Sequence, residues 1–267
     1  MKLYLCGALA TLSAPAFAHD TWVETNTAVY RVGDVAHIDL KLGNHGNSHR
    51  DFKLASKVAL DNVKLEVVAP NGKHYDLKSG LMDTGYTPKE GFWTGEFTNA
   101  APGLYCVHQT MDAVMTYAPE RAIKSAKTFF LASKSLDRVP VSSSGFDHKM
   151  GDALEIVPEN SPITPMGVGM PLKLRLYFKG KPLAKTKISF IPEGETLKEG
   201  FDSRYEALTN INGRTAFTPK EAKRYLAVAH VETKEAGQNA QGEKYDFTKY
   251  GATLTVYVPA ICPCCGE

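Results

Sequence analysis

Short runs of alternating apolar and polar residues, separated by turn residues, dominate the chain. Residues 35–42 (VAHIDLKL) put apolar side chains on one face of a strand and polar ones on the other, and residues 171–178 (PLKLRLYF) repeat this pattern. The same reasoning predicts further strands over residues 63–68, 92–97, 104–110, 128–132, 154–157, 187–191, 207–209, 225–231 and 252–258. The pattern therefore predicts an all-β fold, with one helix candidate over 115–127 that Pro119 interrupts.

One stretch interrupts the β pattern and suggests two domains. Residues 136–151 (LDRVPVSSSGFDHKMG) are rich in Ser and Gly and do not alternate, which is typical of a connection between domains. We expect an N-terminal β domain over 19–135, itself a β-sandwich, and an immunoglobulin-like β-sandwich over 152–259, followed by a Cys-rich tail over 260–267.

The first 18 residues have the features of a secretory signal peptide. Lys2 is followed by an apolar stretch of about ten residues, too short to span a bilayer. Ala16-Phe17-Ala18 then supplies the small residues of a cleavage site. We expect cleavage after Ala18, no membrane insertion of the mature chain, and a periplasmic or secreted location.

The net charge bears on the possible partners, and the cysteines bear on disulfide formation. Loss of Lys2 lowers the formal net charge from +2 to +1, which does not point to nucleic acid as a partner. After cleavage four cysteines remain, Cys106, Cys262, Cys264 and Cys265, and the sequence leaves their three possible pairings open. An oxidising compartment favours a structural disulfide in the tail over a soft-metal clamp.

Several segments, in this order, resemble a known family. They are His19-Asp20-x-Trp22, Arg31-Val32-Gly33-Asp34, Leu42-Gly43-Asn44-His45, Pro102-Gly103-Leu104-Tyr105, Leu154-Glu155-Ile156-Val157-Pro158, residues 177–183 (YFKGKPL) and Thr209-Asn210-x-Asn212-Gly213-Arg214. Together they resemble a bacterial family of periplasmic proteins of unassigned biochemistry, often described as periplasmic components of nickel or cobalt uptake. The resemblance covers nearly the whole mature chain and implies an association with a membrane metal transporter. It does not extend to the Cys-rich tail.

The expected mature N-terminus is the sharpest chemical feature. A terminal His19 binds a metal through its α-amine and one ring nitrogen, closing a chelate ring. A further histidine would complete a nitrogen-rich site of the kind that suits copper(II) or nickel(II). His45 and His49, four residues apart around a flexible Gly46, are the candidates. The alternative is an arbitrary residue on a frayed terminus.

The remaining histidines give weaker signals. His108 shares a strand face with Cys106, which makes it a candidate ligand, although a half-buried packing pair explains the spacing as well. We place His37 on a strand surface, His74 in a turn, His148 in the linker and His230 in a packed strand.

We predict a metal-binding protein of uptake or homeostasis that takes nickel, cobalt or copper and is not an enzyme. The sequence contains no G-x-S-x-G, H-E-x-x-H, P-loop or dinucleotide motif. Two alternatives stay open. One is a structural or adhesive β-sandwich that binds a polysaccharide or a protein. The other is a copper-dependent oxidative enzyme that uses the His19 chelate.

Overall fold

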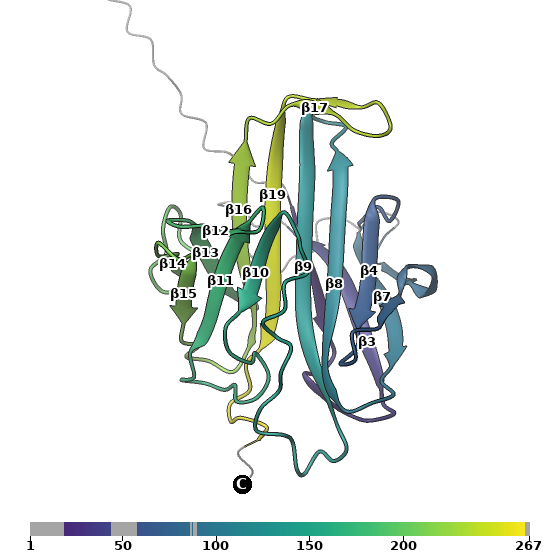
Figure 1. Cartoon of the computed structure of the whole chain (residues 1–267), viewed down its shortest axis with the longest axis vertical. Helices are drawn as coiled ribbons and strands as arrows, with labels where there is room; N and C mark the ends of the chain where they lie inside the picture. The colour runs from purple at the N-terminus through teal and green to yellow at the C-terminus, as the bar shows by residue number, and fades with distance from the viewer. Residues whose placement is uncertain (1–18, 44–57, 86, 88–89, 265–267) are drawn as a thin grey trace, which may run out of the picture.

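The computed structural model of the chain describes residues 19–43, 58–85, 87 and 90–264 (Figure 1). β-strands make up most of this part, and its only helical element is one 3-10 turn, η1 (Lys78–Gly80). No helix in the described part is long and apolar enough to cross a membrane. The expected signal sequence and the segment that carries His45 and His49 lie outside the described residues.

A nine-stranded sheet runs through the whole molecule (Figure 1). In spatial order its strands are β14 (Glu206–Leu208), β13 (Lys187–Pro192), β16 (Arg224–Thr233), β19 (Phe247–Tyr257), β9 (Glu120–Ser133), β8 (Gly103–Val114), β4 (Val63–Val68) and β5 (His74–Asp76), with β2 (Val29–Arg31) paired to β9. At the centre β19 and β9 pair in parallel, from Phe247 opposite Glu120 to Thr255 opposite Thr128. Strands from early and late in the sequence therefore share one sheet.

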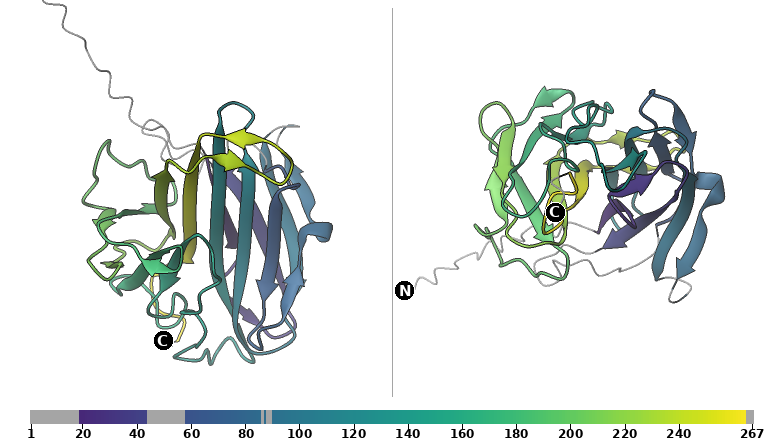
Figure 2. Two further views of the ribbon diagram at one scale, coloured as in Figure 1. Left: turned by 45° about the horizontal axis from the view of Figure 1, so that its top comes forward. Right: turned by 90° about the horizontal axis from the view of Figure 1, so that it is seen from below.

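Two smaller sheets cover opposite faces of this central sheet (Figure 2). One contains β1 (Asp20–Thr25), β3 (Val35–Gly43), β7 (Gly91–Thr98) and β6 (Met82–Gly85). The other contains β10 (Leu154–Pro158), β11 (Leu172–Phe178), β12 (Lys181–Pro182) and β15 (Arg214–Phe217). A short hairpin of β17 (Gly237–Gln238) and β18 (Lys244–Tyr245) caps the ends of the long strands.

The apolar side chains form separate cores on the two faces. Leu104 and Phe129 face β10 and β11, whereas their neighbours Tyr105 and Phe130 face β3. Successive residues of a strand point to opposite faces, so one strand contributes to both cores. The predicted all-β class is confirmed, with sheets that pack face to face as in a β-sandwich.

Local patterns predict some elements correctly and one wrongly. The strand expected over 35–42 is β3, with Ile38 and Leu40 fully buried. The helix expected over 115–127 is absent, because residues 120–127 begin β9. β9 pairs with β8 on one edge and β19 on the other, and these tertiary partners override the local preference.

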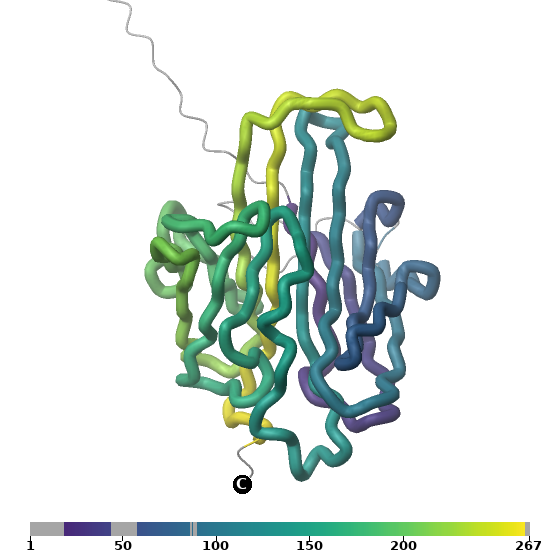
Figure 3. Tube along the Cα trace, viewed as in Figure 1, coloured from purple at the N-terminus to yellow at the C-terminus, as the bar shows by residue number. Residues whose placement is uncertain are grey.

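The Ser/Gly-rich segment connects β9 to β10 and forms no regular element (Figure 3). The central sheet crosses the expected division, because β9 precedes residues 136–151 and β19 follows them. That 152–259 folds as a separate domain stays a prediction.

Candidate functional site

The start of β1 is fixed to the central sheet by polar contacts. Lys124 of β9 donates a hydrogen bond from Nζ to the carbonyl oxygen of His19. The next carboxylate, on buried Asp20, lies 2.8 Å from Nε2 of His230 on β16. His19 itself is half-buried. The residue expected to begin the mature chain is therefore held against the fold.

The surroundings of His19 favour the neutral imidazole. Burial is the main cause that lowers its pKa from the ordinary value of 6.5, and the positive charge of Lys124 lowers it further, against a smaller opposing effect of Asp20. Burial also lowers the pKa of Lys124, although Asp20 and Glu120 act in the opposite direction. A neutral imidazole is the form that binds a metal ion.

Strand pairing relates His19 to the segment that carries the other two candidate ligands. β1 and β3 are antiparallel, with Asp20 opposite Gly43. Gly43 is the last described residue before 44–57, which include His45 and His49. The chain thus leaves β3 beside the residue that follows His19.

The candidate ligand His108 belongs to an ionic network on the other face of the central sheet. Its Nδ1 lies 3.3 Å from Oε1 of Glu66, and its Nε2 lies 3.0 Å from Oδ2 of Asp152. Both ring nitrogens therefore face carboxylates, and the expected pairing of His108 with Cys106 is a shared strand face only. Among the described residues, no group of three or more His, Cys, Asp or Glu side chains is arranged to hold a metal ion.

Glu66 links this network to the surface. Burial raises the pKa of its carboxyl, but hydrogen bonds from Lys64, His74 and His108 together outweigh burial and lower that pKa to about 2. Lys64 Nζ lies 2.8 Å and His74 Nδ1 lies 3.0 Å from Glu66 Oε2. Glu66 is thus held as a carboxylate.

A second, fully buried ion pair lies beside the network. Lys127 Nζ is 2.7 Å from Glu155 Oε1, and both side chains are 2% exposed. The Glu155 carboxylate also accepts hydrogen bonds from the backbone N–H groups of Met150 and Gly151. Glu155 therefore fixes the end of the 136–151 segment against the sheet.

A cleft of about 980 Å³ lies between that segment and the sheet strands β4, β8 and β9. Apolar side chains of β8 and β9, among them Leu104 and Phe129, and the free Cys106 line it on the sheet side. Burial raises the pKa of the Cys106 thiol to about 12. The sequence predicts only a linker here. The cationic and serine residues within that linker are the sequence feature that could have indicated the cleft.

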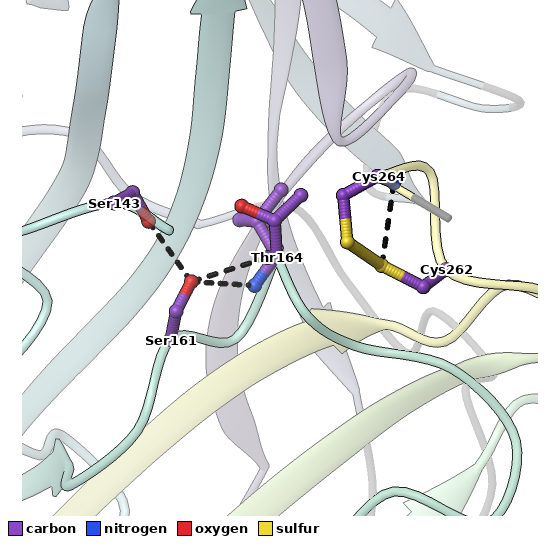
Figure 4. The surroundings of a disulfide bond; sticks show 6 residues. Ser143, Ser161, Thr164, Cys262 and Cys264 are labelled. Carbon is purple, nitrogen blue, oxygen red and sulfur yellow. Dashed lines mark hydrogen bonds between the residues drawn. A yellow bond between two sulfur atoms is a disulfide. The ribbon is translucent and has the colours of Figure 1, made fainter. Parts of the chain in front are cut away.

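The tail cysteines pair differently from the C-x-x-C spacing. Cys262 and Cys264 form a disulfide, which Figure 4 shows with Ser161 and Thr164 in its surroundings. Cys106 is not part of a disulfide. The expected tail disulfide is present, between cysteines two residues apart.

A family model described as a domain of unknown function, DUF4198, matches residues 16–233. This chain belongs to the DUF4198 family. The match confirms the resemblance to a family of unassigned biochemistry, while the link to nickel or cobalt uptake stays a proposal. No curated protein matches this DUF4198 chain.

Solved structures resemble this DUF4198 protein only distantly. A DUF4785 family protein from Legionella pneumophila is 12% identical, with a TM-score of 0.31 over 78% of this chain and 52% of that one. The D0-D1 domain of intimin is 13% identical, with a TM-score of 0.24 over 90% of this chain and 98% of that one. Salmonella alpha-2-macroglobulin reacted with methylamine is 14% identical, with a TM-score of 0.28 over 91% of this chain and 15% of that one. The chain thus spans about half of the Legionella protein, and scores this low carry no argument about function.

Proposed function

We propose that this protein is exported and binds one nickel, cobalt or copper ion at its mature N-terminus, in metal uptake or homeostasis. It acts as a binder that passes the ion to a membrane transporter. The observation that carries the proposal is the fixed position of His19, whose carbonyl oxygen accepts a hydrogen bond from Lys124 at the start of a buried strand.

A fixed terminal histidine is a better ligand than a frayed one. Its α-amine and ring nitrogen close one chelate ring, and less conformational entropy is lost when the residue is already ordered. The α-amine has a reference pKa near ~8, so loss of its proton to a metal at neutral pH costs little. The lowered pKa of His19 keeps the ring nitrogen available as well.

The charges around the site oppose one another. The Lys124 ammonium repels a cation, but burial lowers the pKa of that group and so reduces the cost of its deprotonation. The buried Asp20 carboxylate adjoins His19 and attracts a cation. Asp20 Oδ1 lies 2.8 Å from His230 Nε2, and the Asp20 charge also acts on Lys124, which leaves Asp20 as an orienting group.

His45 and His49 are the proposed additional ligands. They follow Gly43, which pairs with Asp20, and only Asn44 lies between Gly43 and His45 along the chain. A trans-linked chain advances about 3.8 Å per residue between Cα atoms, so His45 is close enough in sequence to reach the His19 side of β1. Three nitrogen ligands of this kind favour copper(II) or nickel(II).

Calorimetric titration with copper(II), nickel(II) and cobalt(II) tests the proposal on the exported protein. His19→Ala should weaken binding at least about tenfold, the loss that even an outer partner of a metal ligand typically causes. His45→Ala and His49→Ala should differ from each other, because one further histidine completes the site. His148→Ala, in the linker, is the matched control and should bind as the wild type does. Equal affinities of His19→Ala and wild type would refute the site.

A further inference from the structure

The cleft beside the 136–151 segment has an apolar floor and a cationic rim. Leu104, Phe129 and Leu131 form its apolar floor, and all three belong to the core that β8 and β9 share with β10 and β11. Val68 and Pro70 continue this apolar surface towards β5. A ligand that enters the cleft therefore meets rigid sheet residues on one side.

The rim of the cleft is cationic. Lys134, Arg138 and Lys149 line it, and its lining contains no Asp or Glu side chain. Lys134 and Arg138 are exposed and form no ion pair with any described residue. Lys149 lies over the ring of Tyr177, 4.9 Å from its centroid, which orients its ammonium without neutralising it.

Hydrogen-bond donors surround these charges. Ser142 and Ser144 are exposed on the rim, and Ser143 is anchored by a 2.9 Å hydrogen bond to Ser161. The Glu155 carboxylate accepts hydrogen bonds from the backbone N–H groups of Met150 and Gly151 and so fixes the far end of the same segment. The cationic wall is thus tied to the fold at its middle and at its far end.

From this composition we propose that the cleft binds a small amphipathic anion, with an apolar body on the sheet floor and a carboxylate at the Lys134–Arg138 rim. A volume of about 980 Å³ is within the range of small-molecule sites. Arg and Lys side chains recognise carboxylates by charge-assisted hydrogen bonds. A metal cation is disfavoured by the same charges, so the site is independent of the one at His19. Fatty and aryl carboxylates share the required chemistry.

Titrations with decanoate, decanol and acetate distinguish the contribution of the carboxylate to binding from that of the apolar body. In calorimetric titrations of the full exported protein, decanoate should bind at least about tenfold more tightly than decanol, because a hydrogen bond to a charged group is the stronger kind. Acetate, which lacks the apolar body, should bind at least about tenfold more weakly than decanoate. A benzoate series then distinguishes an aryl from an alkyl body.

Two variants and a control connect the affinity to the cleft. The double variant Lys134→Ala/Arg138→Ala should weaken decanoate binding at least about tenfold and leave decanol binding unchanged. Cys106→Phe places a larger side chain on the floor and should weaken the binding of decanoate and of decanol. A thermal unfolding scan verifies that this variant folds. Lys220→Ala removes an exposed cation outside the cleft and should change neither. The proposal is overturned if decanoate binds no better than decanol, or if the double variant binds decanoate as the wild type does.

Discussion

Asp20 and His230 are 210 residues apart in sequence, yet Oδ1 of one lies 2.8 Å from Nε2 of the other. The pair joins the first described strand to β16 in the late part of the chain. Gly251 of β19 makes room for it, since a Cβ at that position would lie 3.3 Å from Asp20 Oδ1. The proposed metal site therefore lies beside a residue, Asp20, that strands from the late part of the sequence fix in place.

Trp22 extends this connection through apolar packing. It is fully buried against Leu226 and Val228 of β16. Trp22→Ala should lower the free energy of unfolding by about 3–5 kcal/mol, because it leaves a large cavity. Guanidinium unfolding measures this, with exposed Tyr117→Ala as a control that should cost no more than about 0.5 kcal/mol. A loss below about 1 kcal/mol at Trp22 would show that the strand is not anchored there.

The buried pair of Lys127 and Glu155 gives a second stability prediction. Lys127→Met leaves the Glu155 carboxylate without its cation and should destabilise the protein by about 3–5 kcal/mol. Lys127→Met/Glu155→Gln should regain at least half of that loss, because the glutamine is neutral and keeps an acceptor for the Met150 and Gly151 N–H groups. Urea unfolding of the wild type, both single variants and the double variant completes the cycle. A double variant no more stable than Lys127→Met would contradict the pairing.

Glu66 predicts how stability depends on acid. Its folded-state pKa of about 2 is below the ordinary value of 4.5, so its stabilising contribution is present above pH 4.5 and disappears as the pH falls towards 2. Glu66→Gln removes this contribution, and its stability should therefore change less with pH over that window than the wild type's. Denaturant unfolding at several pH values from 6 to 2.5 measures the difference. Exposed Glu199→Gln, the matched control, should follow the wild type, and parallel curves for all three proteins would rule out the effect.

Alternation predicts a strand well where one face is buried and the other is exposed. β3 shows this, since Ile38 and Leu40 are fully buried while His37 is exposed. Only residues 128–132 of β9 were predicted as a strand, because residues from Ser125 onward are buried on both faces and no alternation marks the full length of the strand. Its parallel partner β19 begins more than 100 residues later, which local patterns do not specify.

The candidate sites show the same limit. The shared face of Cys106 and His108 follows from their spacing and is correct. The partners of His108 are 42 and 44 residues away, so the carboxylates of Glu66 and Asp152 were not predictable from the strand. The serines and cations of the 136–151 segment became a cleft wall only once β4 and β8 were placed opposite them.

If the α-amine of His19 is a metal ligand, blocking that amine should weaken metal binding, and one comparison tests this without altering any side chain of the mature chain. One protein begins at His19, as intact mass must first verify, and the other retains residues 15–18 and begins at Pro15. Both are titrated with copper(II) and nickel(II) by calorimetry, and the copper(II) forms are examined by electron paramagnetic resonance. The retained residues should weaken binding at least about tenfold and change the nitrogen coordination of the copper(II) signal. Equal affinities and identical spectra for the two proteins would contradict a role of the α-amine as a metal ligand.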